Sequence, residues 1–412
     1  MRVVLERSTI KGSISAPQSK SWAIRLLFLS LLTNITIDNL TLSEDVLDAL
    51  DAIGVFNVIT DGRRFYKPSF LKLYRDYVYF RGSATVLRIF IPIAAVVGGR
   101  ITIDGGKGLR RRPLNAIVDA LSEKGIRFSG TTLPITMEGR VRDTCIDIYG
   151  GESSQYITGL MIALIMAGGG SINIRGKISS RSYINLTAEI INSLGGTVHI
   201  HGNRIDVEAS KEITPYEGSI PGDYLLASFY AVAALLTGGY LSIHGLPKPY
   251  SFFGDHSIID IYRSMNAVSI YRDGIWYVEA GDSYRAIEVD VDDSPDLAPS
   301  IAPLAGVARG TTVIRGIERL SIKESDRRNT IVSTLRGFGI EAYDRGEFIE
   351  ITGGNTREGE IVCPDDHRIA MMAASIALKS GGIIDQAECV SKSNPNFWKD
   401  LKIIGGRIYL NQ

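Results

Sequence analysis

The chain has 412 residues, 45% of them hydrophobic and 22% charged, which predicts two or three globular domains with hydrophobic cores. Its 45 Lys and Arg residues balance 45 Asp and Glu residues, so a general electrostatic affinity for nucleic acid or an anionic membrane is not expected. The three cysteines, Cys145, Cys363 and Cys389, are far apart and predict neither a disulfide framework nor a metal site.

The first residues and the apolar segments predict a cytoplasmic protein. Glu6 and Arg7 stand where a signal peptide needs apolar residues. An apolar run such as 225–236 is shorter than the roughly 18 residues that span a bilayer. We therefore expect neither export nor insertion into a membrane.

A short β-branched strand that ends near Gly or Asn recurs six times along the chain. Its aligned isoleucines are Ile37, Ile103, Ile174, Ile243, Ile314 and Ile384, which are 66, 71, 69, 71 and 70 residues apart. Such constant spacing indicates an internal repeat.

Each repeat carries two kinds of helix. An amphipathic helix follows the strand and usually stops at Gly, as in 45–54 and 114–125, because apolar residues recur at helical spacing and Gly is a common C-cap. A second helix precedes the strand and is apolar nearly all round, as in 22–32 and 224–236, which predicts burial. The pattern favours two compact α/β domains of three repeats each; an α/β protein without duplication and a solenoid array are the alternatives.

The six buried helices begin with polar or charged residues. A helix N-terminus offers unpaired N–H groups and the positive end of a dipole, which suits phosphate or carboxylate. If the helices of each domain are aligned, these ends cluster, and two facing clusters form a cleft for a polyanionic ligand. The alternative is that the polar residues only cap the helices; those concerned are Ser19, Ser153, Asp223, Asp296 and Asp366.

Cations at several helix starts favour anion binding. Lys20 and Arg25 flank Ser21, and Arg88 follows the segment GSAT. A cation at the start of an otherwise apolar helix needs an anion, and the local sequence supplies few. Further cations lie in the loop 107–112, in the segment 321–329, and at Arg368 and Lys392, with Arg110, Arg111 and Arg328 interpreted as solvated.

Ten segments resemble, in order, those of the 3-phosphoshikimate 1-carboxyvinyltransferase (EPSP synthase) family. They are APQSKSWAIR, GSATVLR, GLRRRP, GESSQYITGLM, SSRSYINLT, PGDYLLASFY, SPDLAPS, RLSIKESDR, DDHRIAM and VSKSNPNFW. The resemblance implies the enolpyruvyl transferase fold, a two-domain inside-out α/β barrel of six βαβαββ-like repeats. Residues 19–220 would form the N-terminal lobe, and residues 1–18 with 221–412 the C-terminal lobe, with the active site in the interdomain cleft.

The family transfers the enolpyruvyl group of phosphoenolpyruvate to the 5-hydroxyl of shikimate 3-phosphate and releases phosphate, a step toward chorismate and the aromatic amino acids. The resemblance implies that shikimate 3-phosphate contacts Lys20, Ser21, Arg25, Ser153, Ser154, Gln155, Ser180, Tyr183, Asp296, Arg319 and Lys323. It implies that phosphoenolpyruvate contacts Lys20, Ala84, Arg88, Arg112, Gln155, Arg327, Arg368 and Lys392. No cofactor or metal is implied, and the analogy favours a monomer.

The implied catalytic residues are Asp296, Glu324 and Lys20. Glu324 would protonate the methylene carbon and later take a proton back, two tasks that one carboxyl group performs. Asp296 would accept the proton of the 5-hydroxyl. Arg suits carboxylate and phosphate because its fork is bidentate, whereas Lys acts as a point charge.

Three positions depart from the commonest family pattern. Ala84 stands where many members have Gly, and its methyl group is expected to reduce sensitivity to the bulkier analogue glyphosate. Arg319 replaces an Asn that often touches the shikimate phosphate. Leu225 and Leu226 follow Asp223 where small hydroxyl residues are frequent, so a ligand role for that helix start is not expected.

Two other enzyme families and one non-enzyme class remain as alternatives. UDP-N-acetylglucosamine 1-carboxyvinyltransferase shares the fold but usually carries a reactive Cys in the loop that here reads GGKGLRRRP. RNA 3′-phosphate cyclase uses related repeats and a nucleophilic His, but His367 lies in an Asp-His-Arg context that matches the transferase. A non-catalytic repeat protein would not explain Glu324 and Asp296 among so many cations.

Overall fold

The six repeated isoleucine strands form the frame of the fold in this computed structural model, which describes residues 1–178, 180–209, 212–250 and 253–411. Within these ranges the strands form six four-stranded sheets, and each repeated isoleucine lies in a different sheet. The six strands are β3 (Ile35–Ile37), β7 (Gly99–Gly105), β11 (Gly170–Arg175), β15 (Tyr240–His244), β19 (Thr311–Arg315) and β23 (Gly382–Asp385). The six isoleucines are at most 5% exposed, so the repeat marks the buried side of each sheet.

All six sheets share one strand order. In the sheet that contains β7, β6 (Tyr77–Phe80) pairs in parallel with β7. On its other side β7 pairs antiparallel with β9 (Ile135–Gly139), and β9 pairs with β8 (Arg127–Phe128). Each other isoleucine strand likewise has one parallel neighbour: β14 (Tyr216–Gly218), β10 (Cys145–Tyr149), β2 (Lys11–Ser15), β18 (Glu288–Asp290) and β22 (Gly359–Val362). The antiparallel strands beyond them are β5 (Arg64–Tyr66) and β4 (Ile59–Thr60), β13 (Arg204–Val207) and β12 (Val198–His201), β17 (Ile275–Glu279) and β16 (Val268–Arg272), β21 (Phe348–Thr352) and β20 (Glu341–Asp344), and β1 (Arg2–Glu6) and β24 (Arg407–Asn411).

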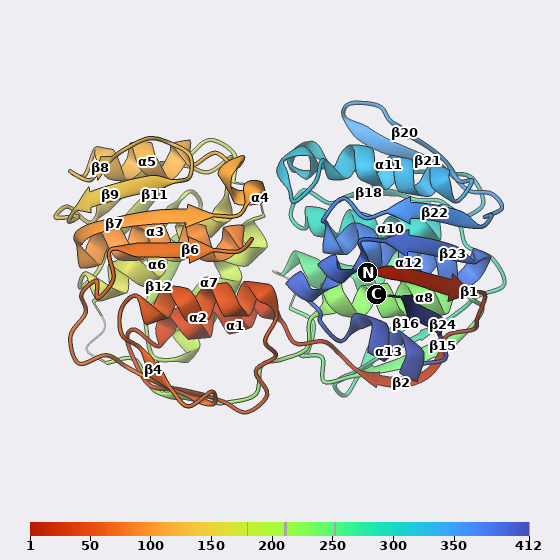
Figure 1. Cartoon of the computed structure of the whole chain (residues 1–412), viewed down its shortest axis with the longest axis horizontal. Coiled ribbons are helices and arrows are strands. Elements are labelled where there is room, and N and C mark those ends of the chain that lie inside the picture. The colour runs from red at the N-terminus through yellow and green to blue at the C-terminus, as the bar shows by residue number, and fades with distance from the viewer. Residues whose placement is uncertain (179, 210–211, 251–252, 412) are drawn as a thin grey trace. The chain divides into compact units, whose positions relative to one another are not determined.

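The N-terminal segment completes two sheets that otherwise belong to the second half of the chain. β1 lies between β23 and β24, with Val3 opposite Ile384 and Leu410, so the two chain ends lie side by side (Figure 1). β2 pairs with β15. The chain accordingly divides into one compact unit of Met1–Ser19 with Pro221–Gln412 and another of Lys20–Ile220, and each contains three of the sheets.

The predicted apolar helices lie in the interior of each unit. They are α1 (Lys20–Leu29), α3 (Ala84–Val97) and α6 (Ser154–Met166) in one unit, and α8 (Tyr224–Leu236), α10 (Ala298–Ala305) and α12 (His367–Ser380) in the other. α8, α10 and α12 pack against one another and carry much of a continuous hydrophobic core. α3 packs closely on α6, where a Cβ added at Gly159 would lie 2.7 Å from the Ile89 carbonyl oxygen.

The amphipathic helices form a second set. They are α2 (Glu44–Gly54), α5 (Asn115–Ser122), α7 (Arg181–Ser193), α9 (Ile258–Ser264), α11 (Arg327–Gly337) and α13 (Phe397–Ile403). A residue with a left-handed φ follows each of them: Asn57, Gly125, Gly195, Asn266, Gly339 and Gly405. α2 ends at Gly54, as expected, but the left-handed turn that follows is made by Asn57 and not by a glycine.

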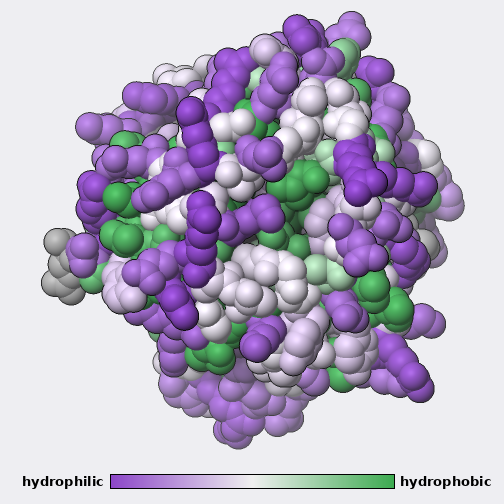
Figure 2. All heavy atoms as spheres, turned by 90° about the vertical axis from the view of Figure 1, so that its right-hand side faces the viewer, coloured by the Kyte–Doolittle hydropathy of each residue, from purple (hydrophilic) through white to green (hydrophobic). Residues whose placement is uncertain are grey.

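The surface is mixed in character. On the face seen in Figure 2, hydrophilic side chains predominate and hydrophobic ones form small separate patches. In the described part of the chain, we find no helix with both the length and the apolar character needed to cross a membrane.

Candidate active site

The residues expected to bind substrate form two groups, one in each compact unit. The unit of Lys20–Ile220 holds Lys20, Ser21, Arg25, Ala84, Arg88, Arg112, Ser153, Ser154, Gln155, Ser180 and Tyr183. The other unit holds Asp296, Arg319, Lys323, Glu324, Arg327, Arg368 and Lys392. We call these the N-terminal cluster and the C-terminal cluster.

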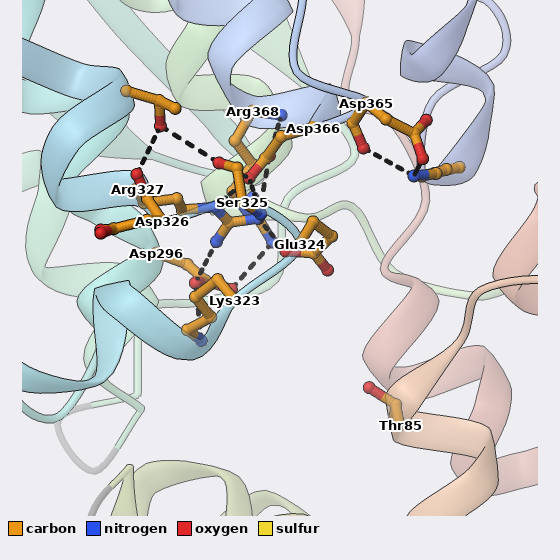
Figure 3. A network of polar contacts seen from close by, with 12 residues as sticks. Thr85, Asp296, Lys323, Glu324, Ser325, Asp326, Arg327, Asp365, Asp366 and Arg368 are labelled. Atoms are coloured by element: carbon orange, nitrogen blue, oxygen red, sulfur yellow. Dashed lines mark hydrogen bonds and ion pairs between the residues drawn. The ribbon is translucent and has the colours of Figure 1, made fainter. Parts of the chain in front are cut away.

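Arg327 is the centre of the C-terminal cluster (Figure 3). This first residue of α11 is 1% exposed, and its donors all reach carboxylates. Nε donates to Asp366 Oδ2 at 2.8 Å and Nη2 to Asp366 Oδ1 at 3.1 Å. Nη1 donates to Asp296 Oδ1 at 2.7 Å, and Nη2 also donates to Glu324. Burial alone would lower the pKa of Arg327, but the three carboxylates outweigh it and raise that pKa.

Asp366 joins the start of α12 to the start of α11. Its side chain caps α12 by accepting from the Arg368 backbone N–H at 3.1 Å. The same carboxylate accepts from the Ser325 backbone N–H at 3.3 Å and the Ser325 hydroxyl at 2.9 Å. Together with its pair of bonds to Arg327, these contacts fix the Lys-Glu-Ser-Asp-Arg segment against α12. Asp366 is thus a helix cap, as the alternative reading allowed, and also an ion-pair partner.

Asp296 is not a helix cap. It lies within a short 3₁₀ turn, η2 (Pro295–Leu297), whose N-cap is Ser294. Its carboxylate lies 2.8 Å from Lys323 Nζ and 3.2 Å from Arg368 Nη2, in addition to the Arg327 contact. Burial alone would raise the pKa of the Asp296 carboxyl, but its three cationic partners hold that pKa well below the usual range.

Lys323 and Arg368 are cations with little solvation. Burial lowers the pKa of Lys323 to about 8, although the Asp296 charge opposes that change. Arg368 is 4% exposed, and its Nε and Nη1 atoms have no hydrogen-bond partner within the described ranges. A buried guanidinium with unused donors is costly unless an anion completes it, so Arg368 is poised to bind one.

Lys392 and Arg319 each lie on a 3₁₀ turn. Lys392, at the end of η4 (Ala387–Lys392), pairs with the Asp365 carboxylate at 2.8 Å and donates to the Asp365 carbonyl at 2.6 Å. Burial would lower the pKa of Lys392, but Asp365 outweighs it and raises that pKa. Arg319 lies in η3 (Glu318–Ile322), which leads directly into Lys323.

In the N-terminal cluster, Lys20 begins α1 and pairs with Asp45 of α2 at 2.5 Å. Both side chains are largely buried, at 15% and 12% exposure. Asp45 was not predicted as a site residue from the sequence, because an acidic residue in the first turn of a helix is common on dipole grounds alone. Its contact holds the Lys20 ammonium group at the start of α1.

Arg25 is a buried arginine that is bound by neutral oxygens. It is 2% exposed, and it donates to the Thr187 and Thr158 hydroxyls at 2.8 and 3.3 Å. It also donates to the Ser21 and Tyr183 carbonyls at 2.8 and 3.1 Å. Burial lowers the pKa of Arg25 to about 10. These contacts tie together α1, α6 and α7, and within the described residues no carboxylate is among the hydrogen-bond partners of Arg25.

Gln155 links the starts of α6 and α3. Its Nε2 donates to Thr85 Oγ1 at 2.7 Å, and its Oε1 accepts from Arg88 Nη1 at 3.0 Å. Arg88 is 6% exposed and its Nε has no hydrogen-bond partner in the described chain. Ala84, the first residue of α3, lies beside Thr85 in this arrangement. Thr85, the partner of the expected site residue Gln155, was not predicted from the sequence.

The remaining expected residues lie at other helix starts. Ser153 caps α6 by accepting from the Gln155 backbone N–H at 3.2 Å, and Ser154 is the first residue of that helix. Ser180 precedes α7 with a left-handed φ of 52°, and Tyr183 lies in the first turn of α7. Arg112 is 9% exposed and precedes α5, whose start is held by Glu152 through the Ala116 backbone N–H at 3.0 Å.

Metal ligation is not indicated within the residues that the structure describes, because no group of three or more His, Cys, Asp or Glu side chains is placed to hold an ion. The two clusters instead gather buried cations, carboxylates and helix N-termini. Such a set of groups suits anionic organic ligands and proton transfer.

Comparisons with known proteins agree on one family. The model of the family described as EPSP synthase (3-phosphoshikimate 1-carboxyvinyltransferase) matches residues 4–401. A 3-phosphoshikimate 1-carboxyvinyltransferase from Saccharolobus islandicus is 48% identical over 99% of both chains, and one from Sulfurisphaera tokodaii is 46% identical over 100% of both. A solved EPSP synthase from Acinetobacter baumannii has the same fold, with a TM-score of 0.78 at 22% identity over 100% of both chains. The chain belongs to the EPSP synthase family.

Proposed function

We propose that this protein transfers the enolpyruvyl group of phosphoenolpyruvate to the 5-hydroxyl of shikimate 3-phosphate, the activity of its family. The observation that best supports the proposed residue roles is that Asp296 and Glu324 both accept hydrogen bonds from Arg327. Two carboxyl groups on one guanidinium supply a base and an acid at a fixed separation, which an addition and elimination sequence needs.

The N-terminal cluster supplies most of the contacts proposed for shikimate 3-phosphate. Ser153, Ser154 and Ser180 are suited to the phosphate, since they lie at the starts of α6 and α7, where N–H groups favour anions. Arg25 adds a buried positive charge beside Tyr183. Lys20, Ser21, Gln155, Asp296, Arg319 and Lys323 complete the proposed set.

Phosphoenolpyruvate is proposed to bind the remaining cations. Arg368 and Arg88 are the best candidates for direct bidentate contacts, because each is buried and has unused donors. Arg112, Lys392, Lys20, Gln155 and the Ala84 backbone region complete this set. Arg327 contributes mainly by its charge, since its nitrogen atoms already bind three carboxylates. The proposal requires both clusters to act on the same pair of substrates.

The proposed chemistry begins with a proton from the Glu324 carboxyl group to the methylene carbon of phosphoenolpyruvate. The oxygen of the 5-hydroxyl group attacks C2, and the hydroxyl proton passes to Asp296. The new C2–O bond gives the tetrahedral intermediate. Glu324 then removes a proton from the new methyl group, the C–C double bond re-forms, and the C2–O bond to phosphate breaks. The cations stabilise the negative charge on the departing phosphate.

Substrate binding tunes Asp296 for this role. In the structure three cations lower the pKa of its carboxyl group, which makes it a weak base. When substrates bind, their phosphate and carboxylate groups also pair with Lys323 and Arg368. This added negative charge raises the pKa of the neighbouring Asp296 carboxyl group. Asp296 therefore becomes a better base only when both anions are present.

Phosphate release from phosphoenolpyruvate tests the assignment directly. The purified protein is expected to release phosphate with shikimate 3-phosphate and not without it. UDP-N-acetylglucosamine serves as the matched acceptor control, since the sister enzymes on this fold use it. Release with only the sugar nucleotide would overturn the assignment. The monomeric state and the cytoplasmic location stay predictions, and light scattering of the purified protein checks the first.

A further inference from the structure

Asp48 is a buried carboxylate that the reaction does not use. It lies in α2, one turn after Asp45, and is 0% exposed. Its two oxygens accept from three consecutive backbone N–H groups: Oδ1 from Arg81 at 2.8 Å, and Oδ2 from Gly82 at 3.1 Å and Ser83 at 2.8 Å. Oδ1 also accepts from Arg81 Nη1 at 3.1 Å. The segment 81–83 is thus wrapped around one side chain.

This segment leads directly into the start of α3. Ser83 is the N-cap of α3, and its hydroxyl accepts from the Val86 backbone N–H. Ala84 follows as the first helical residue, and Thr85 and Arg88 make the contacts with Gln155 described above. Asp48 therefore fixes one end of the helix turn whose other contacts belong to the N-terminal cluster.

We propose that Asp48 is a positioning residue. It fixes the position of the first turn of α3, Ala84–Arg88, and so determines the affinity for phosphoenolpyruvate. The inference rests on the function proposed above, because that function places Ala84 and Arg88 against phosphoenolpyruvate. A charged acceptor with several N–H donors resists displacement more than a neutral one does. A small displacement of a group that contacts a substrate weakens the binding of that substrate.

The neighbouring Asp51 supplies a matched control on the same helix. Its side chain is 43% exposed and contacts Arg81 Nη1 at 2.6 Å. Like Asp48→Asn, Asp51→Asn removes one negative charge that pairs with Arg81, but it leaves the contacts of Asp48 with the backbone N–H groups in place. Asp48→Asn presents an NH2 group to backbone N–H donors and so displaces the segment 81–83.

Steady-state kinetics with each substrate varied tests the proposal. For Asp48→Asn, the KM for phosphoenolpyruvate is expected to rise roughly tenfold, because a hydrogen bond to a charged group is lost. The kcat and the KM for shikimate 3-phosphate are expected to stay near the wild-type values, since loss of uniform binding raises KM alone. Asp51→Asn is expected to match the wild type in all three constants.

Asp48→Glu keeps the charge and both acceptor atoms but moves them by one methylene group. It is expected to fold and to show a smaller rise in the KM for phosphoenolpyruvate, and it decides the question if Asp48→Asn fails to fold. A folded variant with an unchanged KM for phosphoenolpyruvate, or with equal rises for both substrates, overturns the positioning role. Absence of wild-type activity with shikimate 3-phosphate would instead refute the proposed function, so the two failures are distinct.

Discussion

The guanidinium of Arg327 lies 2.7 Å from the Asp296 carboxylate, although 31 positions separate the two residues in the chain. The same guanidinium binds Glu324 and Asp366. Removal of Arg327 therefore leaves three carboxylates close together with their main counter-charge gone. Such a group acts on stability as well as on catalysis.

Arg327→Met is expected to destabilise the protein by about 3 kcal/mol, the lower end of the range for breaking a buried ion pair. The lower end applies because Asp296 and Glu324 are partly exposed, at 19% and 22%. Urea unfolding followed by circular dichroism measures the change. Arg328→Met is the matched control, since Arg328 pairs with a single carboxylate, Asp344, and both side chains are partly exposed, so this pair is expected to contribute less than about 1 kcal/mol. Equal losses for the two variants would contradict the central role of Arg327.

The pKa of Lys323, lowered to about 8 by burial, predicts a pH limit on substrate capture. Below this pKa the ammonium group is charged and attracts anionic substrate, and above it the charge is lost. The kcat/KM for shikimate 3-phosphate reports the free enzyme, so it is expected to fall as the pH rises through about 8. Lys323→Arg keeps its charge at alkaline pH and is expected to lose this decline. A decline near pH 8 that persists in Lys323→Arg would assign the pKa to another group.

The repeat and its helices were predictable from sequence because each repeat signals itself locally. The isoleucine strands follow from β-branched spacing, and the burial of α8 and α12 follows from apolar residues on all sides of the helix. The closure of sheets by β1, β2 and β14 was not predictable in this way. Those pairings join residues hundreds of positions apart, such as Arg2 and Asn411, and no local pattern encodes them.

The site residues were predictable from sequence where they stand at matching positions in the segments that resemble those of the family. The sequence indicated Glu324 and Arg368, but it did not indicate which carboxylates neutralise which cations. Asp45 and Asp48 resemble ordinary acidic residues of an amphipathic helix, and only the packing of α2 shows that each of them faces a helix start. The assignment of Asp296 as a possible helix cap failed for the same reason, since its partners come from distant segments.

Ala84 predicts the response to glyphosate. The residue is 6% exposed at the start of α3, and its methyl group is expected to crowd an analogue bulkier than phosphoenolpyruvate. Ala84→Gly is expected to lower the glyphosate inhibition constant by about tenfold, the effect of one methylene in a tight pocket. Ala95→Gly, buried in the same helix, controls for helix destabilisation and is expected to leave inhibition unchanged. An unchanged glyphosate inhibition constant in Ala84→Gly would contradict the proposed crowding by the Ala84 methyl group.

Glu324 and Asp296 are expected to give different kinetic defects when they are neutralised. Glu324→Gln removes the proposed acid but leaves Lys323 and Arg368 paired with Asp296, so kcat is expected to fall about 10²-fold or more while shikimate 3-phosphate binds as before. Asp296→Asn removes the carboxylate that neutralises these cations, so kcat is expected to fall while anion affinity rises.

Titration calorimetry with shikimate 3-phosphate and phosphate release measure the two properties. Deuterium incorporation from heavy water into the methylene group of the product provides a third test, because the proton that Glu324 adds comes from solvent. Wild type is expected to incorporate deuterium, and Glu324→Gln is expected to do so far more slowly. Incorporation at the wild-type rate in Glu324→Gln would show that another group protonates phosphoenolpyruvate, and it would leave Glu324 with a role in holding Arg327.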